Sequence, residues 1–272
     1  LARGESRSDT IENILKTAHE IAQTDAKEVV LTGVNIGDFG QGEKENFYGL
    51  IKELDEIKDI ERFRISSIEP NLLSNEIIDF CLSKSKRFAP HFHIPLQSGS
   101  DRLLKLMRRK YERKLYAERV ARIKSLRKDS CIGVDVIVGF PGESDEDFNE
   151  TIEFIKDLDV SYLHVFTYSE RANTGAPKLG TAVPMEVRRT RSKQLHLISD
   201  RKKRNFYTEN LNTERIVLFE YEEDEGYMFG FTENYIKVKF PFDAKLTNTF
   251  QRIRLTEIDR DGIMKCSLST EF

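Results

Sequence analysis

Strands, polar loops and helices alternate through the first part of the chain, and this repeat limits the possible folds most strongly. Short apolar runs, predicted as strands, end near five positions: Thr32, Ser67, Gln97, Gly139 and Tyr168. Strand ends separated by roughly 30–40 residues are typical of βα units in a parallel sheet or barrel. Five strands are too few to close an eight-stranded barrel, and a helix precedes the first of them. We therefore predict an α/β fold: an open, partial TIM-like (βα) barrel that lacks its first strand.

The segment 91–101, HFHIPLQSGSD, illustrates one such unit. Its apolar residues alternate with His91, His93 and Pro95, which is the period of a strand with two distinct faces. We expect the two histidines to be hydrogen-bonded within the sheet. Residues 97–100 then supply polar groups, and the last two residues of the segment can cap the helix that follows. Since ligands of parallel α/β folds bind at the carboxyl ends of strands, this loop is a candidate site.

Polar side chains also follow the other predicted strands. The candidates for a ligand pocket are Thr32, Asn35, Ser66, Ser67, Glu69, Gln97, Ser98, Ser100, Asp135 and Glu143. A cavity ringed by such groups suits a small ligand with ammonium, carboxylate and hydroxyl groups. Each residue also has an ordinary structural interpretation: Asn35 as a turn residue, Ser98 and Ser100 as helix caps, and Glu143 as a partner of a helix dipole.

The pattern changes after residue 184. Residues 184–207 are strongly basic and are predicted to form a linker helix, whereas residues 208–272 contain short alternating strands separated by turns. The second pattern is typical of a small all-β barrel. We therefore predict two domains, residues 1–207 and residues 208–272. The helix and barrel suit RNA binding and an ordinary solvated surface equally well. The cations that could contact RNA are Arg188, Arg189, Arg191, Arg201, Lys202, Arg204, Lys237 and Lys239.

Charge and cysteine content restrict the setting of the protein. With a formal net charge of −3, any nucleic-acid surface must be a local patch. Cys81, Cys131 and Cys266 are far apart and form no CxxC pair, which favours a reducing compartment. No apolar run approaches the ~18 residues of a membrane span, and the first residues do not resemble a signal peptide. We expect a cytoplasmic monomer without membrane contact.

Several segments together resemble the radical S-adenosylmethionine (SAM) methylthiotransferases. In order, these are LARGESRS, VVLTGVNIGDFG, ISSIEP, HFHIPLQSGSDRLLKLMRRKY, GVDVIVGFPGESDEDF and LHVFTYSERANTGA. The terminal barrel is similar to the TRAM domain of this family, an RNA-binding module. LTGVNIGDFG most resembles the branch that methylthiolates C2 of N6-threonylcarbamoyladenosine next to the anticodon of tRNA. Branches acting on isopentenyladenosine in tRNA or on ribosomal protein S12 remain alternatives.

The resemblance implies a six-unit open barrel, SAM as cofactor and two 4Fe-4S clusters. In the family a CxxxCxxC loop that holds one cluster lies just before a segment like LARGESRS, and Cys81, Cys131 and Cys266 match none of the cluster ligands. The chain therefore resembles a fragment, left by truncation or proteolysis, that is expected to be inactive alone. The implied partners are the anticodon stem-loop of tRNA and an electron donor such as a flavodoxin.

The resemblance also implies roles for the residues at the strand ends. The amino end of SAM would face Thr32, Gly33 and Asn35, which follow the first strand. Its ribose or methionine part would contact Glu69 and Gln97. Asp135 and the backbone of residues 138–139 would border the adenine. The full set of implied cofactor-binding residues is Thr32, Gly33, Asn35, Glu69, Gln97, Ser98, Asp135, Val138 and Gly139.

Two other function classes fit the same patterns. One is a βα-barrel enzyme such as an aldolase, which a buried strand-end lysine would favour, but none of the predicted strand-end loops offers one. The other is a non-catalytic RNA-binding protein that uses only the basic helix and the terminal barrel.

Overall fold

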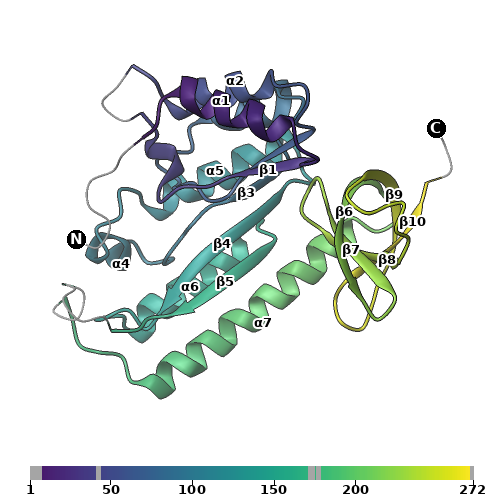
Figure 1. Ribbon diagram of the computed structural model, residues 1–272. Helices are drawn as coiled ribbons and strands as arrows, with labels where there is room; N and C mark the ends of the chain where they lie inside the picture. Colours follow the sequence, from purple (N-terminus) through teal and green to yellow (C-terminus); the bar gives the residue numbers. More distant parts are fainter. Residues whose placement is uncertain (1–7, 41–43, 171–174, 176–178, 270–272) are drawn as a thin grey trace.

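The structure is a computed structural model that describes residues 8–40, 44–170, 175 and 179–269 (Figure 1). The segment LARGESRS, apart from Ser8, and most of residues 171–178 lie outside this range. The first part of the chain contains α1 (Ile11–Ala22), β1 (Glu28–Leu31), the 3-10 turn η1 (Ile36–Asp38), α2 (Phe47–Asp55), β2 (Arg62–Ile65), α3 (Asn75–Asp79), the π-helical turn η2 (Phe80–Lys84), β3 (His91–His93), α4 (Asp101–Leu106), α5 (Arg113–Leu126), β4 (Cys131–Val138), α6 (Asp145–Asp157) and β5 (Tyr162–Thr167).

The five strands of this part run parallel, as the βα repeat predicts. β1 pairs with β2, while β3, β4 and β5 form a second sheet in that order. A single bridge between Phe63 and Phe88 and a hydrogen bond of 3.0 Å from the Ile68 amide to the His93 carbonyl link the two sheets. Figure 1 shows helices along one side of this curved surface. The fold is therefore the predicted open, partial barrel.

Local sequence signals position the helices. Asn46 and Ser74 accept hydrogen bonds from backbone amides at the starts of α2 and α3. Ser144 and Asp147 form the reciprocal capping box of α6. At α1 the cap is Thr10, and Asp9 accepts a hydrogen bond of 2.8 Å from the Thr10 backbone amide. Capping therefore fixes where these loops end, which places the strand-end residues.

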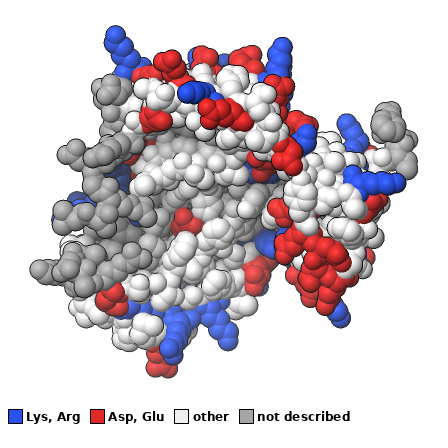
Figure 2. All heavy atoms as spheres, in the orientation of Figure 1, with Lys and Arg blue, Asp and Glu red and all other residues white. Residues whose placement is uncertain are grey.

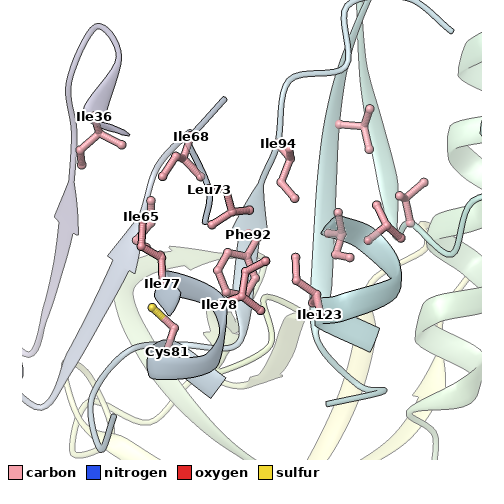
Figure 3. Packing of buried hydrophobic residues seen from close by; sticks show 14 of the residues in the cluster. Ile36, Ile65, Ile68, Leu73, Ile77, Ile78, Cys81, Phe92, Ile94 and Ile123 are labelled. Carbon is pink, nitrogen blue, oxygen red and sulfur yellow. The ribbon is translucent and has the colours of Figure 1, made fainter. Parts of the chain in front are cut away.

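The main core lies between the strands and the covering helices. Figure 3 shows Phe92 of β3 and the nearby Ile94 beside three further apolar side chains: Leu73, which precedes α3, Ile78 of α3 and Ile123 of α5. All five side chains are almost fully buried. Burying one such side chain contributes about 1.5–3 kcal/mol to stability. The helices and this core cover one face of the parallel strands. The other face is available to form a ligand-binding site.

The second part of the chain contains α7 (Met185–Glu209), β6 (Glu214–Asp224), β7 (Tyr227–Thr232), β8 (Lys237–Pro241), β9 (Phe250–Ile258) and β10 (Met264–Leu268). The five strands form the predicted all-β structure, a closed barrel in the order β10-β8-β7-β6-β9 with its own apolar core. α7 packs on β5, where the Ser199 hydroxyl bonds both backbone groups of Leu163 at 2.9 and 3.0 Å. None of the helices in the described part of the chain combines the length and apolar character that a bilayer crossing requires.

Two buried arginines attach the barrel to the amino-terminal ends of the parallel strands. Arg64 on β2 donates to the carbonyls of Thr232 and Glu233 at 2.7 and 3.0 Å, and to Glu28 at 2.9 Å. Arg62 donates to Glu28 as well and to the carbonyl of Phe231 at 3.2 Å. Each guanidinium thus joins a carboxylate of β1 to backbone acceptors of the barrel, which is the strong charge-assisted type of hydrogen bond.

Candidate functional site

A cavity of about 540 Å³ lies on the face of the parallel strands that the main core does not use. Its volume falls within the roughly 300–1,000 Å³ typical of small-molecule sites. Figure 2 shows a hollowed face with few charged atoms between the helices and the barrel. The cavity is lined by Glu28, Val30, Arg62, Arg64, Ile65, Ser66, Ser67, His91, His93, Asp135, Tyr162, His164, Phe166, Leu218, Glu220, Phe231 and Tyr235.

Strand alternation explains which side chains reach this cavity. On β5, Tyr162, His164 and Phe166 occupy every second position, and they all line the cavity. His91 and His93 do the same on β3. The cavity is therefore built mostly from strands rather than loops, which holds its side chains in fixed positions.

Three titratable side chains meet in the middle of the cavity wall. The Nε2 atom of His93 lies 2.8 Å from Oδ1 of Asp135, and Nδ1 of His164 lies 3.5 Å from the same oxygen. Burial, with His93 close by, lowers the pKa of His164 below its ordinary value. The His164 imidazole is therefore neutral near pH 7, which leaves a nitrogen lone pair available to accept a proton or bind a ligand.

Stacked aromatic rings close the end of the cavity next to the barrel. The His91 ring lies 4.0 Å from the Tyr235 ring, which in turn lies 4.7 Å from the Phe231 ring. Burial, followed by the nearby charge of Arg64, holds the pKa of His91 well below its usual range. Nδ1 of His91 is buried without a hydrogen-bond partner among the described residues. The His91 imidazole at this end of the cavity is consequently neutral.

At the carboxyl end of β3, Gln97 has a left-handed backbone with φ of 68°. The backbone amide of Gln97 donates to the backbone carbonyl of Asp135 at 2.8 Å. The backbone amide of Ile137 donates to the backbone carbonyl of Gln97 at 2.9 Å. These two bonds hold a conformation that costs a non-glycine residue about 1–3 kcal/mol and is concentrated at functional sites. The structure thus brings Gln97 together with the strand that carries Asp135.

Gly139, at the carboxyl end of β4, requires glycine because its φ is +78° and a Cβ atom would meet the Arg188 side chain at 2.4 Å. Its amide donates to Oε2 of Glu143 at 2.6 Å. Burial raises the pKa of Glu143, although the Gly139 amide and Arg191 oppose that shift. Glu143 therefore stabilises the turn in which the Val138–Gly139 backbone was predicted to border adenine.

The remaining predicted cofactor residues lie in varied environments. Thr32 and Gly33 are exposed after β1, and the half-buried Asn35 bonds Asp38. Glu69 forms an ion pair of 2.9 Å with Arg109. The hydroxyl of Ser98 is buried 3.3 Å from Thr151 of α6, away from solvent. All nine predicted cofactor-binding residues lie in the described ranges. Among them, only Asp135 lines the 540 Å³ cavity.

The predicted RNA-binding cations divide into two groups. Arg189, Arg201 and Arg204 are exposed on α7, and Lys202 is half-buried and donates to the Leu158 carbonyl at 2.6 Å. On the barrel, Lys237 lies over the Phe229 ring and Lys239 pairs with Asp259. Figure 2 shows Lys and Arg along the lower edge, where Figure 1 places α7, and Asp and Glu gathered on the barrel.

Arg188 and Arg191 do not fit the predicted contact with RNA. They are 2% and 5% exposed, although they lie within the basic helix. Arg188 pairs with Glu170 at 2.5 Å, and Arg191 pairs with Glu143 and Asp145, each at 2.6 Å. Because both guanidinium groups are buried against carboxylates, they hold α7 onto the parallel strands and are not free to bind phosphate.

Sequence reasoning missed His164, Tyr162 and the Glu28–arginine cluster as parts of a site. The alternation in YLHVFTY placed the first two on one face of a strand, which was the available signal. Arg62 and Arg64 alternate in the same way on β2, but their role depends on the distant barrel. The sequence of β2 alone does not indicate that Arg62 and Arg64 contact the barrel.

The cysteines do not fit the iron–sulfur cluster that the resemblance implies. Cys81 and Cys131 are buried in different elements and Cys266 lies on β10. Burial raises the pKa of Cys131 and of Cys266 to about 12, so neither thiol is a ready ligand. In the described ranges, the one group of metal-ligating side chains close enough to share an ion is His93, Asp135 and His164.

Comparison with known proteins gives consistent matches. A family model described as "Radical SAM superfamily" matches residues 1–155. The chain is 42% and 39% identical to proteins named "Threonylcarbamoyladenosine tRNA methylthiotransferase MtaB" from Aquifex aeolicus and Bacillus subtilis. It is 32% identical to a "tRNA-2-methylthio-N(6)-dimethylallyladenosine synthase" from Desulfitobacterium hafniense. These matches cover 88%, 93% and 94% of this chain but 57%, 57% and 58% of the relatives, so the chain spans little more than half their length.

Proposed function

The chain belongs to the radical SAM superfamily, and from this premise we propose that the protein methylthiolates N6-threonylcarbamoyladenosine at C2, next to the anticodon of tRNA. The observation that carries the proposal is the identity of 42% and 39% to two relatives named for this activity. The relative named for dimethylallyladenosine is less similar, at 32%, and supports the second candidate substrate. The terminal barrel is consistent with an RNA substrate.

The family implies SAM and a 4Fe-4S cluster as cofactors. SAM, once it has received one electron through the cluster, would supply a radical able to abstract hydrogen from an unreactive C–H bond. The chain's own contribution is to bind and orient the reactants and to exclude water. The described residues do not fit the cluster, and we assign it no ligands among them. For SAM we propose the strand-end residues, with Gln97 and the Gly139 backbone as the best-supported pair, because both follow adjacent strands and both have left-handed backbone conformations.

We propose that residues 208–272 are a TRAM-like RNA-binding domain and that residues 184–207 extend its surface. The exposed cations Arg189, Arg201 and Arg204 lie on one helix that ends at the barrel. The barrel itself presents the acidic hairpin 220–225, which would repel phosphate. The proposed surface therefore follows α7 and leaves this hairpin free. An electron donor such as a flavodoxin and a monomeric cytoplasmic state complete the proposal.

Replacing Gln97 should weaken SAM binding without unfolding the chain. Gln97→Gly removes the side-chain amide and relieves the left-handed strain, so we expect unchanged or raised stability. Loss of one hydrogen bond to a charged ligand group costs about 1.5–3 kcal/mol, so affinity should fall by about 10- to 150-fold. Titration calorimetry with the whole protein measures the affinity of each variant for SAM. Gln97→Asn is the control, because it keeps a side-chain amide. Equal affinity in Gln97→Gly and the wild type would place the SAM site elsewhere.

Reversal of the exposed cations of α7 should weaken RNA binding. For Arg189, Arg201 and Arg204 changed to Glu, we expect lower affinity for every tRNA, because phosphate contacts carry no sequence information. The slope of log affinity against log salt should fall by about 0.7–0.9 for each lost phosphate contact. Filter binding over a salt series measures both quantities. The matched control reverses three exposed lysines on α1, α2 and the following loop: Lys16, Lys52 and Lys58. Equal losses in the two triple variants would contradict an RNA surface on α7.

The chain alone should not assemble a 4Fe-4S cluster. The three cysteines lie in separate elements, and two of them are buried. After anaerobic reconstitution with iron and sulfide and removal of unbound metal, we expect no brown absorbance and no 5′-deoxyadenosine from added SAM. A stoichiometric cluster with SAM cleavage would overturn this prediction.

Deletion of the gene that encodes this chain tests the substrate. Mass spectrometry of tRNA nucleosides should show loss of 2-methylthio-N6-threonylcarbamoyladenosine and accumulation of the precursor without the methylthio group. Plasmid-borne wild-type gene should restore the product, and the same gene with Gln97→Gly should restore it less well. Loss of the methylthiolated dimethylallyladenosine instead would assign the second candidate substrate.

A further inference from the structure

We infer that His93, Asp135 and His164 form a binding site for one divalent transition-metal ion, of the class that includes Zn²⁺ and Co²⁺. The ligand atoms of these three side chains lie within 4.8 Å of one another. Two imidazole nitrogens and one carboxylate oxygen are a ligand set preferred by such ions, whereas Mg²⁺ and Ca²⁺ prefer oxygen alone. The inference rests on this cluster and not on the proposed function.

The distances leave a place for an ion. His93 makes a hydrogen bond of 2.8 Å to Oδ1 of Asp135, but the 3.5 Å from His164 to the same oxygen exceeds the usual length of such a bond. Metal–ligand bonds of about 2.0–2.2 Å separate neighbouring ligand atoms by roughly 3–3.5 Å. Small side-chain rotations therefore bring all three atoms to one ion without moving the strands.

The surrounding residues hold the cluster in position. The three ligands come from the adjacent strands β3, β4 and β5, with Asp135 directly opposite His164 in the ladder. The Tyr162 ring packs 6.3 Å from the His93 ring and 5.2 Å from the His164 ring. Gly133 makes room for this arrangement, because a Cβ atom there would lie 2.4 Å from the Tyr162 ring and 2.8 Å from His93. The site is thus supported by packing and not by chance proximity on a loop.

The cluster also faces an open cavity. The side chain of His164 is 56% exposed and that of Asp135 is 20% exposed, and all three ligands line the 540 Å³ space. Three protein ligands with solvent beyond them are the arrangement of metal sites that keep a position for water or a ligand. We therefore expect the bound ion to accept an oxygen donor, such as a carboxylate, from a molecule in the cavity.

Cobalt(II) titration of the 272-residue chain, prepared without a polyhistidine tag, tests the site. We expect one Co²⁺ per chain with visible d–d absorption, displaced by Zn²⁺. His164→Ala should weaken binding by more than about 10-fold, since losing even a residue that only orients a ligand costs about 10–100-fold. The half-exposed His164 can be removed without opening the core, and circular dichroism checks the fold. Asp135→Asn should have the same effect.

His196→Ala is the matched control, because His196 is exposed on α7 and outside the cluster. It should bind Co²⁺ like the wild type. The inference is overturned if the wild-type chain shows no saturable Co²⁺ binding, or if His164→Ala binds as tightly as His196→Ala. Thiolate-to-cobalt charge-transfer absorption would also overturn it, because the ion would then be bound by cysteine.

Discussion

Replacement of Arg64 by alanine should lower the free energy of unfolding by about 3–5 kcal/mol, the cost of removing one partner from a buried ion pair. Arg64 is 2% exposed, and its loss leaves Glu28 and the carbonyls of Thr232 and Glu233 without this donor. Arg62 contacts the same carboxylate but cannot replace the lost carbonyl contacts from its own position. We expect the barrel to loosen from the parallel strands as stability falls.

Urea unfolding followed by circular dichroism measures this loss, and hydrogen exchange of the barrel amides measures the loosening. The control is Arg122→Ala, which breaks the Arg122–Asp79 pair. That pair is bidentate, but its side chains are 41% and 33% exposed, so its loss should cost no more than about 1 kcal/mol. If Arg64→Ala fails to fold, Arg64→Lys keeps the charge and should show an intermediate loss. Equal losses in Arg64→Ala and Arg122→Ala would contradict the attachment described here.

Asp147→Ala should cost about 2–4 kcal/mol, since it removes a helix cap and charge-assisted hydrogen bonds together. The buried carboxylate accepts from the Ser100 hydroxyl at 2.7 Å, the Ser144 amide at 2.9 Å and Nε of Arg102 at 3.0 Å. It therefore ties the 97–100 loop to the start of α6. Urea unfolding measures the loss, and Glu146→Ala is the control because Glu146 lies exposed in the same turn.

The same carboxylate should make stability depend on pH. Burial alone would raise the pKa of Asp147, but hydrogen bonds from Arg102, Ser100 and Ser144 outweigh it and hold the pKa well below its usual range. A pKa that is lower in the folded state adds stability above the unfolded pKa of about 3.9, and this stability is lost as pH falls further. The difference between wild type and Asp147→Asn should thus be constant above about pH 5 and shrink below pH 4. A difference that does not change with pH would contradict this assignment.

The strands and helices were predictable because their signals are local. The alternation around Phe92, the capping box at Ser144 and the turn residues between the barrel strands each depend on a few neighbouring positions. The structure contains the predicted all-β barrel, and β3, β4 and β5 pair in parallel as the predicted βα units require.

The interior of the site was less predictable, because it depends on which strand face the helices cover. Alternation placed Tyr162 and His164 on one face, but did not say whether that face was solvent or cavity. Charge patterns were similarly ambiguous: Arg188 and Arg191 belong to a basic helix, yet Glu170 and Glu143 from other elements neutralise them. Partners that lie far away in the sequence decide such cases.

The docking of the barrel has a consequence for how the chain can diverge. Arg62 and Arg64 recognise main-chain carbonyls of residues 231–233, and every amino acid at those positions supplies a carbonyl. Substitutions at those positions leave the acceptors in place as long as the turn keeps its path. We therefore expect the outer side chains of the barrel to vary among related chains, whereas Arg62, Arg64 and Glu28 should be conserved. Barrels from related chains should then be exchangeable.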